Sequence, residues 1–173
     1  GNFHGAPVAL VLDYAAIAVT DLMSIAERRI DRLINPDMNE GLPPFLTSNA
    51  GTGSGFMIAH VAAVSLLTEA KVLAHPASVD NAPTSGGKED HVSMGMTAAL
   101  KLRSIVDLAE NVIAIELLTA AEGLEYRKPL KPGRGVLAAY EKVRGLVPRL
   151  EEDRVLSNDI AAVAASIRRD LLG

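Results

Sequence analysis

The segment His91–Tyr126 reads HVSMGMTAALKLRSIVDLAENVIAIELLTAAEGLEY, and it predicts a helix that is apolar on most of its sides. Its apolar residues fall on two stripes, one beginning Val92, Met96, Ala99 and the other beginning Ala98, Ile105, Leu108. A helix of this kind is buried on most sides. It would be roughly 50 Å long, whereas a compact domain of this size has a radius of gyration of about 16 Å. We therefore expect long helices that pack against other parts of a larger subunit or against sister subunits.

Four further helices are predicted at residues 7–34, 54–74, 136–145 and 158–172. The first shows the three-four spacing of one helical face, with Val8, Val11, Ala15, Val19, Leu22, Ala26, Ile30 and Leu33. Ser157 or Asn158 can cap the last helix. The predicted fold class is all-α, an elongated bundle of long antiparallel helices. Residues 1–173 form a single helical region without an internal repeat.

The composition supports a helical fold and excludes several classes of partner. Hydrophobic residues make up 49% of the chain but aromatic residues only 3%, so Ala, Leu, Val and Ile must fill the core. The net charge is −4 and the Lys and Arg residues are dispersed, so the chain has no basic stripe and nucleic acid is not an expected partner. The run Gly55–Leu67 is too short for a membrane span, so no membrane partner is expected. The absence of cysteine fits a cytoplasmic protein.

The loop between the second and third predicted helices, residues 76–90, is rich in Pro, Ser, Asn, Thr and Gly and is long enough to suggest a function. Glu89 is the first candidate for a catalytic residue. We expect it at the start of the long helix, where partial positive charge favours a carboxylate. It could pair with a cationic group or share a proton with an imidazole. Alternatively, Glu89 and Asp90 are only first-turn acids, with Asp90 or Ser93 as the cap.

The remaining candidates are histidine, serine and phenylalanine side chains. The four histidines show no metal-binding spacing and there is no cysteine, so no metal is expected. His60 is interpreted as a core histidine with a hydrogen-bonded ring. No serine has the context of a hydrolase nucleophile. Phe3 could pack on a flat substrate ring or, alternatively, fasten the chain end to the first helix.

Several separated stretches resemble the histidine branch of the aromatic amino acid ammonia-lyases, in the order found in that family. They are Gly1-Asn2-Phe3-His4-Gly5, Ala26-Glu27-Arg28-Arg29, Gly41-Leu42-Pro43-Pro44-Phe45-Leu46, Ser54-Gly55-Phe56-Met57-Ile58-Ala59, Lys71-Val72-Leu73-Ala74-His75-Pro76-Ala77-Ser78 and Glu89-Asp90-His91-Val92-Ser93-Met94-Gly95. The resemblance implies a helix-rich homotetramer that eliminates ammonia from an aromatic amino acid. It also implies active sites built by several subunits around a methylidene-imidazolone cofactor, made from an internal Ala-Ser-Gly.

The resemblance also implies roles for individual residues. Phe3 and Glu89 would contact the substrate, and Asn2 and His4 would support the pocket. Glu89 resembles the histidine lyases, which convert histidine to urocanate. Lys88, expected near the substrate, replaces a glutamine of that branch. The identity of the substrate therefore stays open, and a tyrosine or phenylalanine lyase or an aminomutase is the alternative.

The chain contains no Ala-Ser-Gly, so it cannot form the cofactor by itself. Its first residues already match a family motif. We expect the C-terminal part of a larger enzyme, inactive in isolation. The competing hypothesis is a non-catalytic helical scaffold that serves oligomerisation. The apolar stripes of the long helix predict association in either case.

Overall fold

The computed structural model describes residues 3–169 and consists of five helices. They are α1 (Ala6–Ile34), α2 (Met57–Leu73), α3 (Gly95–Glu125), α4 (Arg134–Leu146) and α5 (Ser157–Arg168). Two short 3-10 turns, η1 (Pro44–Leu46) and η2 (Ser85–Gly87), lie in the connections. Residues 3–169 contain no β-strand. The prediction of an all-α fold is confirmed.

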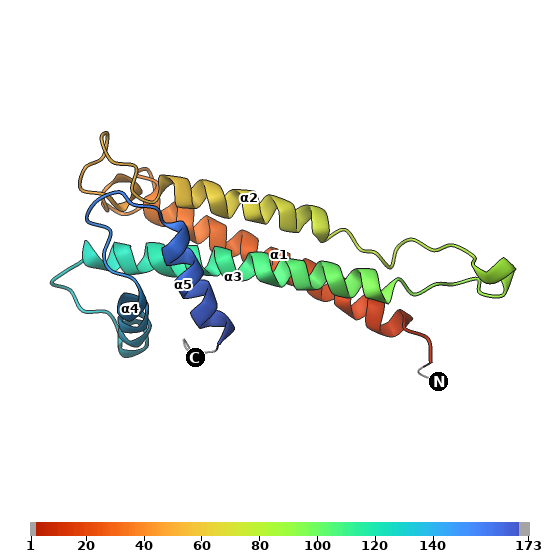
Figure 1. Ribbon diagram of the computed structural model, residues 1–173. Coiled ribbons are helices and arrows are strands. Elements are labelled where there is room, and N and C mark those ends of the chain that lie inside the picture. Colours follow the sequence, from red (N-terminus) through yellow and green to blue (C-terminus); the bar gives the residue numbers. More distant parts are fainter. Residues whose placement is uncertain (1–2, 170–173) are drawn as a thin grey trace.

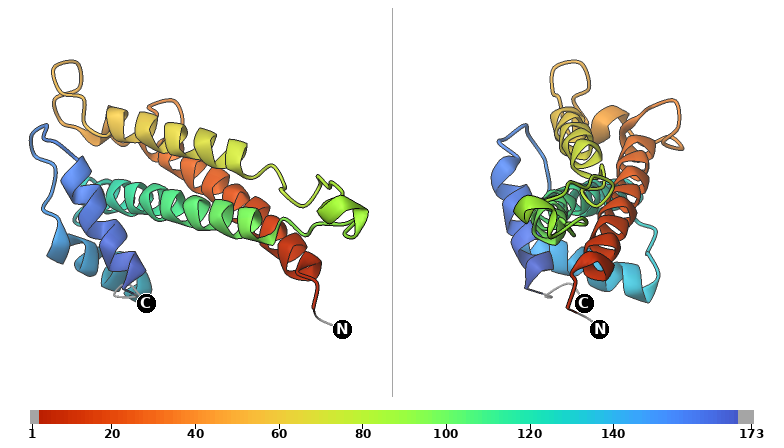
Figure 2. Two further views of the ribbon diagram at one scale, coloured as in Figure 1. Left: turned by 45° about the vertical axis from the view of Figure 1, so that its right-hand side comes forward. Right: turned by 90° about the vertical axis from the view of Figure 1, so that its right-hand side faces the viewer.

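The three long helices form an elongated bundle (Figure 1). α1 and α3 run in the same direction, and α2 runs in the opposite direction. The closest packing is between α1 and α3, with α2 against both. The two shorter helices, α4 and α5, pack at the end of the bundle where α3 finishes (Figure 2).

The core is built from small and aliphatic side chains, as the composition predicts. Buried alanines occur on all three long helices, for example Ala16, Ala63 and Ala114. Small side chains let helix backbones approach closely, and larger residues such as Met23 and Ile115 fill the remaining space. A low aromatic content is therefore compatible with a dense core.

The buried face of α1 differs from the predicted one. Its buried residues alternate at spacings of four and three, namely Ala9, Asp13, Ala16, Thr20, Met23, Glu27, Ile30 and Ile34, with Ala26 beside them. From the predicted stripe only Ala26 and Ile30 are buried, whereas Val8, Val11 and Leu22 are exposed. The prediction was wrong because α1 is apolar on most sides, so hydrophobicity alone does not identify the face that meets α3.

The starts of two helices also differ from the prediction. α3 begins at Gly95, because Met94 adopts a left-handed conformation with φ of 54° at the N-cap. Glu89 thus lies six residues before the helix, and the argument from helix charge fails, since that field falls off within one turn. Neither Asp90 nor Ser93 caps α3, and neither Ser157 nor Asn158 caps α5, whose N-cap is Leu156.

α1 is long and apolar enough to cross a membrane by length and composition. Within residues 3–169, this helix and not the run 55–67 meets these requirements. However, α1 buries two carboxylates, Asp13 and Glu27, within the bundle. Both have partners on other segments, so one face of α1 packs within the bundle.

Candidate functional site

Four of the five predicted site residues lie together in the structure. Phe3, His4 and residues 88–91 line an open hollow of about 460 Å³. It lies at the end of the bundle where the chain enters α1 and where the connection between α2 and α3 projects (Figure 1). The fifth predicted residue, Asn2, lies outside the described residues.

The imidazole of His4 links the N-terminal segment to this connection. Its Nδ1 accepts a hydrogen bond from the Ala6 backbone N–H at 3.2 Å, so the ring hydrogen is on Nε2, which donates to the His91 carbonyl at 2.8 Å. The His4 and His91 rings are 5.4 Å apart. Phe3 is fully exposed beside them. The alternative prediction, that Phe3 fastens the chain end to α1, is therefore wrong.

The connection, residues 76–94 and here called the arm, extends beyond the helices as a narrow excursion (Figures 1 and 2). Near its tip, the Thr84 N–H donates to the Glu89 carbonyl at 2.8 Å and the Glu89 N–H to the Thr84 carbonyl at 3.4 Å. The turn between them contains Gly86 and Gly87, both at positive φ, a conformation that suits glycine. This turn presents Lys88 and Glu89 to the hollow.

The side chains of Lys88 and Glu89 are both exposed. Within residues 3–169, neither forms a hydrogen bond or an ion pair. A carboxylate and an ammonium group are thus available to a ligand in the hollow, next to the ring of Phe3. Such a set of groups can bind a small zwitterion that carries a flat ring.

The base of the arm is fastened to the bundle by charged residues that the sequence analysis did not single out. The buried Asp13 carboxylate accepts a hydrogen bond from the Ser78 N–H at 2.8 Å, and Lys101 donates to the His75 carbonyl. Burial raises the pKa of Asp13, but hydrogen bonds from Ser78 and Ala77 and the charge of Lys101 lower it overall. The sequence signal for a buried polar contact here is the spacing of seven residues between Asp13, Thr20 and Glu27 in α1.

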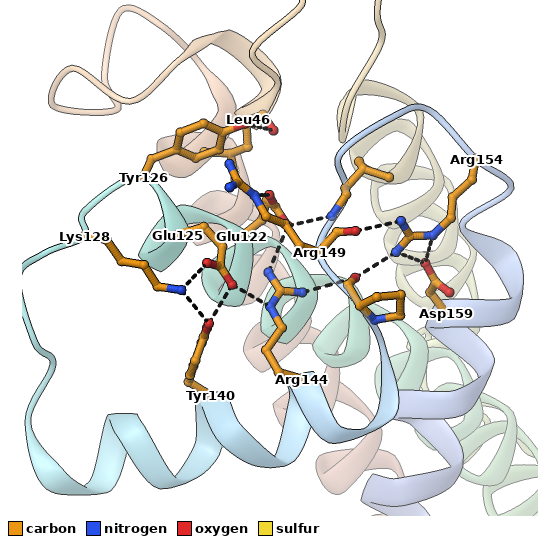
Figure 3. Close-up of polar contacts among 12 residues, drawn as sticks. Leu46, Glu122, Glu125, Tyr126, Lys128, Tyr140, Arg144, Arg149, Arg154 and Asp159 are labelled. Carbon is orange, nitrogen blue, oxygen red and sulfur yellow. Dashed lines mark hydrogen bonds and ion pairs between the residues drawn. The ribbon is translucent and has the colours of Figure 1, made fainter.

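Other polar clusters in the described residues have structural roles. His60 forms a 2.6 Å contact through Nε2 with Glu27, which confirms its hydrogen-bonded ring. At the far end of α3, Glu122 and Glu125 bind side chains from α4 and the following segment (Figure 3). No group of three or more potential metal ligands lies together within residues 3–169.

A family model described as aromatic amino acid lyase matches residues 1–145. The chain belongs to this family. Histidine ammonia-lyase from Stigmatella aurantiaca is 57% identical over 96% of this chain and 32% of its own length. The enzyme of the same name from Sorangium cellulosum is 54% identical over 99% of the chain and 34% of its own length. The chain thus spans about a third of the curated relatives that it matches.

Solved structures of lyase-family proteins share the fold. Histidine ammonia-lyase from Trypanosoma cruzi has a TM-score of 0.95 and 46% identity, over 99% of this chain and 34% of that protein. Tyrosine aminomutase from Streptomyces globisporus has a TM-score of 0.94 and 37% identity, over 99% and 33%. The elongated bundle is therefore a common framework for lyases and aminomutases.

Proposed function

We propose that this chain acts within a histidine ammonia-lyase, which eliminates ammonia from L-histidine to give urocanate. The observation that carries the proposal is the free carboxylate of Glu89, held in an open hollow beside the ring of Phe3. Relatives that are 54–57% identical to this chain are named histidine ammonia-lyases. The proposed setting is a cytoplasmic homotetramer.

Each residue of the hollow has a proposed task. Glu89 accepts a hydrogen bond from the substrate or exchanges a proton with its imidazole. Phe3 packs on the substrate ring, Lys88 contributes positive charge near the substrate carboxylate, and His4 keeps the N-terminal segment against the arm. The hollow is open on one side, so other parts of the enzyme must complete the site.

The family's methylidene-imidazolone would supply the electrophile of the reaction. The 173 residues contain no Ala-Ser-Gly from which it could form. The groups that line the hollow are acidic, basic and aromatic, and they suit a substrate that carries an amine, a carboxylate and a ring. The chain therefore contributes to substrate binding and proton transfer, and the cofactor belongs to residues outside it.

The test is a product assay on the full-length enzyme that contains these residues, with histidine, tyrosine and phenylalanine offered separately. We expect the ultraviolet absorbance of urocanate from histidine. Glu89→Gln should lower kcat/KM for histidine by roughly 10²- to 10⁴-fold, because the amide cannot exchange the proton. Glu141→Gln, an exposed change on α4, is the matched control and should leave kcat/KM unchanged.

The second candidate function is an aminomutase, favoured by the fold match to tyrosine aminomutase at 37% identity. A β-amino acid formed from tyrosine would support it and contradict the histidine proposal. A full-length protein that is inactive on every amino acid tested would favour the helical scaffold.

A further inference from the structure

The peptide group that joins His91 to Val92 is held on both sides by side chains from separate segments. Its carbonyl, that of His91, accepts from His4 Nε2 at 2.8 Å. Its N–H, that of Val92, donates to Asn81 Oδ1 at 3.0 Å. Asn81 also donates through Nδ2 to the Val92 carbonyl at 2.9 Å. One amide side chain thus binds both backbone groups of Val92.

The two hydrogen bonds between Asn81 and Val92 connect the outgoing and returning halves of the arm. Asn81 and Val92 form one crosslink, and the backbone pair of Thr84 and Glu89 forms a second one nearer the tip. Glu89 belongs to the second crosslink, on the returning half of the arm that Asn81 holds at Val92. The two crosslinks together contain four hydrogen bonds. The one from the Glu89 N–H is 3.4 Å long, and the amide of Asn81 makes two of the three shorter ones. The arm itself is rich in residues without bulky side chains and buries little that could fix its course.

We propose that Asn81 is a positioning residue for the active site, and this inference rests on the proposed function. By fixing the backbone of Val92, it sets the register in which the arm presents Glu89 and Lys88 to the hollow. It also aligns the peptide group between His91 and Val92 with the ring of His4, the residue that follows Phe3. Asn81 thereby couples the two segments that line the hollow without touching the substrate.

A positioning role predicts a loss of rate without a loss of stability. Asn81 is exposed, so its replacement removes local hydrogen bonds but no core packing. Misplacing a catalytic group by about 1 Å can reduce the rate by about 100-fold. In the full-length enzyme, Asn81→Ala should lower kcat for histidine roughly 10- to 100-fold. KM should change less, and the thermal midpoint should stay within about 2 °C of the parent.

Two further variants separate positioning from general damage. Asn81→Asp keeps the acceptor for the Val92 N–H but loses the donor to its carbonyl, so its kcat should be intermediate. Within residues 3–169, the side-chain amide of Asn111 donates to the Asp107 carbonyl of the same helix, so Asn111→Ala should behave as the parent. An Asn81→Ala enzyme with parental kcat, or one with a lowered thermal midpoint and proportionate loss of active protein, would overturn the inference.

Amide hydrogen exchange gives a readout that does not depend on the substrate. Peptides covering residues 84–92 should exchange about five- to thirtyfold faster in Asn81→Ala than in the parent, because two hydrogen bonds are lost and each contributes roughly a fivefold factor. Asn111→Ala should not change this exchange. If the parent enzyme produces no urocanate, the proposed function fails while faster exchange still supports the role of Asn81. Unchanged exchange in Asn81→Ala would contradict that role whatever the activity.

Discussion

Glu125, near the end of α3, shows how one residue can connect several segments. Its carboxylate contacts Lys128 Nζ at 2.6 Å, the Tyr140 hydroxyl at 2.6 Å and Arg144 Nε at 2.9 Å (Figure 3). Burial raises the pKa of Glu125, but the hydrogen bonds from these three side chains outweigh it and lower the pKa to about 2. The charged form therefore stabilises the junction between α3 and α4.

This low pKa predicts a pH-dependent contribution to stability. Because the folded pKa lies below the ordinary value of 4.5, the contribution is present above pH 4.5 and is lost as the pH falls toward 2. Glu125→Gln should lower stability at pH 7 by at most about 3 kcal/mol. The difference from the parent should shrink between pH 5 and pH 3. Thermal unfolding across this range measures it.

The matched control for this experiment is Glu141→Gln, on the exposed side of α4. It should leave the thermal midpoint unchanged at every pH. A Glu125→Gln protein whose midpoint differs from the parent by the same amount at pH 7 and pH 3 would contradict the proposed ion-pair contribution.

At the scale of elements, the entry to α2 depends on one glycine. Gly55 has a φ of 52°, its N–H donates to Asp153 at 3.0 Å, and an added Cβ would overlap the Phe45 carbonyl oxygen. Backbone atoms cannot move aside as a flexible side chain can. This position therefore requires glycine for both conformation and space.

Two alanine substitutions should change stability in opposite directions. Gly55→Ala should destabilise the protein by roughly 2–3 kcal/mol, through backbone strain and overlap. Gly145→Ala lies within α4 and would have no neighbour within 4 Å, so it should stabilise by about 0.5–1 kcal/mol through helix propensity. Thermal unfolding of the two variants beside the parent tests this. A stabilised Gly55→Ala protein would show that the bend adapts.

At the scale of the whole molecule, the bundle leaves a large apolar surface uncovered. Exposed apolar side chains are concentrated on the long helices, including Val8, Leu10, Val11, Tyr14 and Ile17 of α1, Val61 and Val72 of α2, and Met96 and Leu100 of α3. Surfaces of this extent usually bind other protein. The bundle is therefore expected to need further polypeptide to cover it.

Residues 1–173 produced alone should consequently associate, and should form no urocanate because they lack Ala-Ser-Gly. Analytical ultracentrifugation should detect species larger than the 18.2 kDa chain. Val11→Glu, in the exposed face of α1, should weaken association, whereas Val155→Glu, outside the helices, should not. Circular dichroism checks that each variant remains helical. A helical monomer, or turnover of histidine by this segment, would contradict these expectations.

Much of the candidate site was predictable because its residues belong to recognisable motifs. The stretch around Phe3 and the stretch around Glu89 both match the lyase family, and the structure brings them to one hollow. Asn81 was not predictable, because an asparagine in a polar loop carries no signal until its partner is known. Its partner, Val92, lies 11 residues away and contributes only backbone atoms.

Local patterns determined the helical class and the approximate course of the helices, and the family motifs pointed to the candidate site residues. Period and composition act over a few turns, so they can be read directly from the chain. The buried face of α1, the start of α3 at Gly95 and the crosslinks of the arm depended on the tertiary structure. The start of α3 depends on the left-handed conformation of Met94, and the crosslinks depend on which residues of the folded arm face one another. The buried face of α1 results from contacts with other helices, because an apolar helix offers several faces of similar hydrophobicity until a neighbour selects one.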